Sequence, residues 1–187
     1  MFASFNPVRP LPLTLVTSNL FVQGTIQARV RRLTDVLREA DADVLTLEDV
    51  KFIEIGSHRI VGNAVVGQVA LSDVLMVHTT VNTEGTEELR TSKQPIKVLL
   101  MAPPFSIDGL VHLSYEADLA VSIRGLTERW IPVTGARYWA YGVAEEPVSV
   151  ELLIVNHQKV HISVPRGTEW SPAAPPAGGS RPAPGGW

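Results

Sequence analysis

The chain has 187 residues, of which 45% are hydrophobic and 19% are charged, with a formal net charge of −3 and a pI near 5.9. This balance is typical of a globular protein and excludes a general electrostatic attraction to phosphate backbones or anionic membranes. The absence of cysteine excludes disulfides, thiolate catalysis and cysteine–zinc sites. No signal peptide is expected, and no apolar run approaches the ~20 residues that cross a bilayer. We therefore expect a cytoplasmic protein with no membrane partner.

Three features mark the first part of the chain. Residues 1–11 lack hydrophobic periodicity, so they are predicted to be an extended lead-in to a β module over residues 12–83. Alternation over residues 13–30 predicts one long strand, or two short strands with a bend at Ser18 and Asn19. Apolar residues recur at i, i+3, i+4 and i+7 in residues 31–40, which predicts a helix with one buried face.

Strands are predicted for the rest of this module. Residues 44–55 alternate strongly and end at Gly56, as expected for a strand. Residues 60–83 are rich in β-branched side chains interrupted by glycine, which favours strands and hairpins over a helix.

A second β module is predicted over residues 95–165, after a polar linker at residues 84–94. The pattern predicts strands at 96–101, 105–113, 129–141, 148–155 and 159–164, with a short helix or turn near 117–124. Residues 166–187 are rich in proline, glycine and alanine and end in Trp187. This composition predicts a disordered tail.

The two modules look like diverged copies of one unit. Pro10 and Pro95 each open an apolar strand that reaches a glycine fourteen residues later, Gly24 and Gly109. The apolar positions around these glycines also match: Leu20 with Phe105, Val22 with Ile107, Ile26 with Val111, and Ala28 with Leu113. Residues 44–47 match 130–133, and the closing runs 74–77 and 152–155 are matched in turn.

This repetition predicts the fold class. The chain is expected to be mainly β: a tandem repeat of two small β-barrel or sandwich modules, each with one short helix, followed by the disordered tail. Each module spans roughly 70 residues, a size at which one hydrophobic core is marginal. The modules are therefore expected to pack against each other or against further subunits.

The final hairpin, VELLIVNHQKVHISV at residues 150–164, resembles the last two strands of Sm-like small barrels. Gly109, followed by alternating apolar residues, is similar to the strongly bent strand of that family. The resemblance implies a small barrel and makes RNA an alternative partner. The chain has Asn156-His157 where the family has an arginine–glycine pair that holds RNA, and the family's earlier Asp-x-x-x-Asn element has no counterpart.

Arginines form the only basic concentration in the chain. Arg29, Arg31 and Arg32 are candidate nucleic-acid contacts, because arginine binds phosphate oxygens. No aromatic residue interleaves with them, as stacking on single strands would require. The nearby Asp35 and Glu39 offer competing ion-pair partners, which favours a solvated helix face.

Other candidate chemistry has weaker support. His157 and His161 are four residues apart, a zinc-binding spacing on a helix but not across a turn. The acidic residues 41, 43, 48 and 49 offer oxygen ligands, yet they lack the glycine and the final glutamate of a calcium loop. No serine lies in a glycine-flanked elbow and no glycine loop precedes a helix. We expect no catalytic residues, no metal and no cofactor.

Large aromatic residues give the remaining candidate site. Alternation places Trp130 and Tyr138 on one face of their strand, and Trp139 and Tyr141 on the other. One set is expected in the core and the other at a protein interface, where rigid aromatics are favoured, with Trp187 as a further anchor. The predicted function is a non-catalytic scaffold or adaptor that self-associates as a homo-oligomer or docks another protein. The alternative is an RNA-binding Sm-like module.

Overall fold

The computed structural model describes residues 8–29, 32–40, 43–81, 93–114, 126–141 and 146–165. Over these ranges the protein is mainly β, and ten strands pair in one antiparallel sheet. The elements are β1 Arg9–Val16, β2 Leu20–Ala28, α1 Leu33–Glu39, β3 Val44–Glu54, β4 Ile60–Ala70, β5 Met76–His78, β6 Lys93–Ala102, β7 Phe105–Ser114, β8 Trp130–Ala140, β9 Val148–Asn156, the 3-10 turn η2 His157–Lys159 and β10 Ile162–Pro165.

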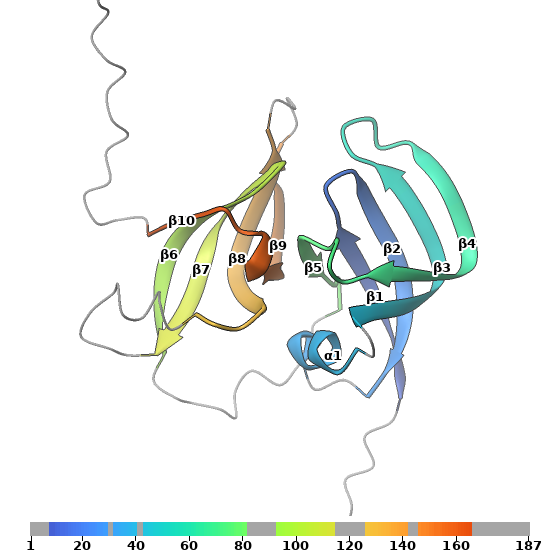
Figure 1. Cartoon of the computed structure of the whole chain (residues 1–187), viewed down its shortest axis with the longest axis horizontal. Coiled ribbons are helices and arrows are strands. Elements are labelled where there is room, and N and C mark those ends of the chain that lie inside the picture. The colour runs from blue at the N-terminus through green and yellow to red at the C-terminus, as the bar shows by residue number, and fades with distance from the viewer. Residues whose placement is uncertain are drawn as a thin grey trace, which may run out of the picture.

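The sheet curls into two halves that meet at one seam (Figure 1). The first half contains β1–β5 and α1, and the second half contains β6–β10. The strand order is β10-β6-β7-β8-β9-β5-β1-β2-β3-β4, so β5 and β9 join the halves at the seam. Within each half, the fifth strand lies beside the first, and the second, third and fourth strands follow on the other side. The two outer edges of the sheet are therefore β4 and β10.

The ladders of the two halves share one register. Leu13 pairs with Gly24 in β1–β2, and Val98 pairs with Gly109 in β6–β7, 85 residues later. Every pair of β1–β2 from Arg9 to Val16 has such a partner pair in β6–β7. We call residues that are related in this way equivalent positions.

From the third strand onward the spacing between equivalent positions is 86 residues. Leu45 pairs with Val69 in β3–β4, and Ile131 pairs with Val155 in β8–β9. The fifth strands follow the same spacing, because the pairing of β5 with β1 is matched by that of β10 with β6.

A glycine in the second strand of each half permits a close crossing over the third strand. Gly24 and Gly109 both lie where the ladder to the next strand shifts register. A Cβ atom on Gly109 would lie 2.6 Å from Val133 Cγ1. Opposite the two glycines, Asp49 and Gly135 have φ angles of 51° and 55°. An extra residue in the third strand at this point is a β-bulge, which bends the strand and curls the sheet.

The cores of the two halves interlock across the seam. The first buried cluster consists mainly of first-half residues, but it also contains Trp130 and Ile154 from the second half. The second cluster consists mainly of second-half residues and contains Val16, Leu75 and Met76 from the first half. Both faces of the sheet are therefore covered at the seam.

Helix α1 confirms the helix predicted for residues 31–40, with shorter bounds. Leu33 and Leu37 are buried, and Val36 and Ala40 pack half-buried against the first cluster. These are the four positions that the i, i+3, i+4, i+7 pattern assigned to one face. No helix within the described residues is both long and apolar enough to cross a bilayer.

Two sequence predictions need correction, and two fall outside the described ranges. β1 begins at Arg9, inside the predicted lead-in 1–11, because its first residues pair with the end of β2. β6 begins at Lys93, inside the predicted linker 84–94, because that residue pairs with the end of β7. The helix or turn predicted near 117–124 and the tail 166–187 lie outside the described residues.

The match between the closing runs 74–77 and 152–155 is also wrong. Residues 76–77 lie in β5, the fifth strand of the first half, whereas residues 152–155 lie in β9, the fourth strand of the second. The two runs look alike because both strands lie at the seam and are covered on both faces.

Candidate protein-docking edge and groove

The sheet ends at β4, a long strand with a neighbour on one side only among the described residues. Its eleven residues, IVGNAVVGQVA, contain no charge and no proline. Val65 and Val66 are 79% and 57% exposed, and Ile60 and Val61 are also exposed. Natural proteins commonly protect an edge strand with lysine, proline, bulges or a covering segment. An uncharged, apolar edge of this length is suited to pairing with another strand.

The opposite edge is formed by β10, which is much shorter. β10 pairs with β6 from Ile162 opposite Met101 to Pro165 opposite Val98. Just before it, the His161 N–H donates to Met101 O at 2.8 Å. A proline can occupy such a strand only where its missing N–H is not needed by the ladder, as at an edge.

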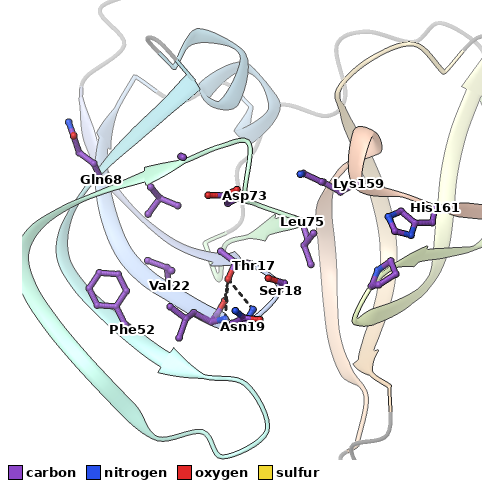
Figure 2. Close-up of a pocket in the computed structure, with 14 residues that line it drawn as sticks. Thr17, Ser18, Asn19, Val22, Phe52, Gln68, Asp73, Leu75, Lys159 and His161 are labelled. Carbon is purple, nitrogen blue, oxygen red and sulfur yellow. Dashed lines mark hydrogen bonds between the residues drawn. The ribbon is translucent and has the colours of Figure 1, made fainter.

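A groove of about 560 Å³ lies between the inner face of β4 and the start of β10. Its apolar wall comes from the first half and includes Leu20, Val22, Phe52 and Val69. Figure 2 shows Val22, Phe52 and Gln68 on one side, and Lys159 and His161 across from them. The groove therefore joins an apolar wall to a polar rim.

The rim near the β1–β2 turn is held by Thr17. Its Oγ1 accepts hydrogen bonds from the Leu20 N–H at 3.0 Å and the Asn19 N–H at 3.3 Å. The same oxygen donates to Leu20 O at 3.1 Å. These local bonds fix the turn that carries Ser18 and Asn19, which also line the groove (Figure 2).

Asn156 links the two halves at the seam. This fully buried residue donates its backbone N–H to Leu75 O at 2.8 Å. Its side-chain Nδ2 donates to Val74 O at 2.9 Å, and its Oδ1 accepts from the Gln158 N–H at 3.2 Å. Because each of these polar groups has a partner, the seam buries them without a large desolvation cost. Ala70 is the equivalent position in β4.

Ion pairs link the start of β8 to the first half. Arg129 contacts Asp43 at 2.5 Å and lies over the Trp130 ring, 5.3 Å from its centroid. Arg38 of α1 pairs with Glu128. Both side chains of the Arg38–Glu128 pair are exposed, so this link between α1 and the segment before β8 contributes little stability.

A histidine and a tyrosine meet on the inner side of the seam. His78 Nε2 lies 3.3 Å from the Tyr138 hydroxyl oxygen. Burial lowers the pKa of His78 and raises the pKa of Tyr138 to about 12. Both shifts favour the uncharged form, so this contact is neutral at physiological pH.

The predicted interface aromatics are separated by the fold. Trp130 is buried in the first cluster and Tyr138 in the second, so the prediction that they share one face is wrong. The bulge at Gly135 adds one residue to β8 relative to β7, which exchanges the faces of the residues that follow. Trp139 is half-buried and Tyr141 is exposed. Trp187 lies outside the described residues.

The predicted RNA contacts lie in separate elements. Arg29 is exposed just after β2, and Arg32 is half-buried at the start of α1. Arg31 lies outside the described residues. RNA binding by this cluster stays a prediction.

The candidate metal ligands are placed as follows. His157 is half-buried in η2, and His161 is exposed before β10. Asp43 pairs with Arg129, and Asp49 occupies the bulge of β3. In the described part of the chain, no three His, Asp or Glu side chains are grouped as a metal-binding set.

Sequence reasoning missed β4 as the candidate site. The available signal was the absence of any charge or proline over residues 60–70. That signal gains meaning only when the pairing order places the run at an outer edge. Comparison of the chain with protein-family models, curated proteins and solved structures finds no significant match in any of the three.

Proposed function

We propose that the protein is a non-catalytic scaffold that self-associates through the two ends of its sheet. The observation that carries this proposal is the outer edge of β4. The side chains of this strand carry no charge, and among the described residues no strand pairs with it on the side away from β3. Pairing with a second strand would satisfy its outward N–H and C=O groups and remove Val66 from water. Each such backbone bond contributes roughly 0.5–1.5 kcal/mol net, and burial of one valine side chain roughly 1.5–3 kcal/mol.

A tandem repeat of two small Sm-like barrels is part of this proposal. Its support is the shared register of the two halves and the equivalent bulges at Asp49 and Gly135. A duplicated unit carries two copies of each docking surface. One copy of each is used at the seam, and the other copy is left at an outer edge.

The native mass of the full chain tests the proposal. The monomer mass is 20.3 kDa. We expect sedimentation equilibrium to give a mass that is a multiple of this value and that decreases on dilution. A mass of 20.3 kDa across the micromolar range would contradict self-association. The same sample measured with a polyuridine oligonucleotide tests the RNA alternative, which requires a mass increase with a salt-dependent affinity.

A further inference from the structure

The seam shows how a fourth strand and a fifth strand of this protein pair. β5, the fifth strand of the first half, runs antiparallel to β9, the fourth strand of the second. In this ladder Met76 lies opposite Val155, and Val77 lies opposite Ile154. The two outer edges of the sheet, as the described strands form it, are the other members of the same pair of surfaces, because β4 is equivalent to β9 and β10 is equivalent to β5.

The outward face of β4 carries residues whose equivalents are covered at the seam. Leu152 of β9 packs half-buried against the first cluster, and its equivalent on β4 is Val66, which is 57% exposed. The neighbouring residue of β4, Val65, has an equivalent that is not covered at the seam. Glu151 of β9 is exposed, and so is its equivalent, Val65. The seam thus separates the residues of β4 that would be covered from those that would stay in water.

The groove beside β4 has a filled equivalent in the second half. Two half-buried residues of its wall are equivalent to residues of the second cluster that are 3% exposed or less: Leu20 to Phe105, and Phe52 to Tyr138. The wall residues Val22 and Val69, equivalent to Ile107 and Val155, are already buried. The same cluster contains Val16, Leu75 and Met76, which the first half contributes at the seam.

The second half carries the equivalents of these three first-half residues. They are Met101, His161 and Ile162, at the outer edge formed by β6 and β10. Met101 is half-buried and His161 is exposed in the single chain. The outer edge of one copy therefore presents the segment that the groove of another copy lacks.

The polar residues of the two edges also match. At the seam, Ile154 faces Val77, and both are buried in the first cluster. The equivalents of these two residues are Gln68 on β4 and Ser163 on β10. An apolar pair at the seam is thus replaced by a polar pair at the outer edges, and both partners change together.

We propose that β10 of one copy pairs antiparallel with β4 of a second copy in the register of the seam. Ser163 then lies opposite Gln68, Ile162 opposite Val69, and Val164 opposite Gly67, with Met101 and His161 entering the groove. This inference rests on the proposed self-association and specifies its geometry. The contact joins unlike surfaces, so copies associate head to tail and form a closed ring or a filament.

Disulfide trapping tests this register, because the natural chain has no cysteine. Gln68→Cys and Ser163→Cys proteins are prepared separately, mixed and oxidised with copper phenanthroline. A covalent dimer is expected from the mixture and not from either protein alone, and a ladder of covalent multimers is expected from the double variant. The matched control is Val65→Cys mixed with Ser163→Cys, which should give no dimer because residue 65 faces away. Circular dichroism of each variant checks that it is folded.

The possible results separate this inference from the proposed function. A Gln68→Cys protein that cross-links to itself shows that β4 pairs with β4, which overturns the head-to-tail register. A native mass above that of the monomer without any Gln68–Ser163 disulfide also overturns it and leaves self-association standing. A native protein that is monomeric in sedimentation overturns both.

Discussion

Gly109 is the residue at which the sheet crosses itself most closely. A Cβ atom there would lie 2.6 Å from Val133 Cγ1 and 3.2 Å from Thr134 O. We expect Gly109→Ala to lower the free energy of unfolding by roughly 1–3 kcal/mol, as overpacking does in a closed core. Urea denaturation followed by circular dichroism measures this change.

Gly62 provides the matched control. A Cβ atom on this residue of β4 would meet only Phe52 Cδ2, at an ordinary 3.5 Å. Gly62→Ala should therefore change the free energy of unfolding by a few tenths of a kcal/mol, in line with other surface substitutions. Equal effects of the two substitutions would show that the crossing at Gly109 is not tightly packed.

His78 gives the fold a predictable dependence on pH. Burial lowers its pKa in the folded state, so the unfolded chain binds a proton more readily. The free energy of unfolding should be highest above the ordinary histidine pKa of about 6.5 and should decrease as the pH falls below it. Urea midpoints measured between about pH 5.5 and 7.5 test this prediction.

The contribution of this one histidine is isolated by substitution. A His78→Gln variant keeps a polar side chain but cannot become charged, so its stability should vary less over the same pH interval. An identical slope for the native and variant proteins would assign the pH dependence to other groups.

At the scale of the strand, the neighbouring residues Val66 and Val65 of β4 are expected to differ in how far docking covers them. Val66 is equivalent to the covered Leu152, whereas Val65 is equivalent to the exposed Glu151. Val66→Glu should place a charge in the interface and weaken self-association about tenfold or more, a change of at least about 1.4 kcal/mol. Val65→Glu adds the same charge on the other face and should leave the association almost unchanged. Sedimentation equilibrium of both variants compares them directly, and equal weakening would contradict the assignment of faces.

Local patterns were sufficient to predict several elements. The four apolar positions of α1 and the alternation of β3 are properties of short windows, and both are found in the structure. The match of Gly24 with Gly109 also agrees with the observed ladders, because a glycine at a close crossing is a local steric requirement.

Other features depend on contacts that are distant in sequence. The positive φ at Gly135 changes which cluster receives Tyr138, and alternation alone cannot locate a bulge. The role of β4 as an edge follows from the pairing of β5 with β9, whose residues are separated by most of the second half. From its sequence alone, the segment 60–70 is equally consistent with a central strand and with an edge strand. The pairing order is needed to decide between the two.

At the scale of the whole molecule, the seam makes the two halves dependent on each other. Trp130 and Ile154 complete the first cluster, and Leu75 and Met76 complete the second. The seam uses the fourth strand of the second half, β9, and the fifth strand of the first half, β5. The other fourth strand, β4, and the other fifth strand, β10, are left at the two ends of the sheet. The account therefore predicts an assembly built by repeating a contact that the chain already contains.

Amide hydrogen exchange of β4 tests this central claim most directly. In the assembled protein, backbone amides of residues 67–70 should exchange slowly, because β10 of a second copy covers the edge. In Val66→Glu, diluted until sedimentation gives the monomer mass, the amides of this segment that point away from β3 should exchange rapidly. Slow exchange in the native protein and fast exchange in the variant is the predicted result. Fast exchange in both proteins would show that the edge stays open and would contradict the account.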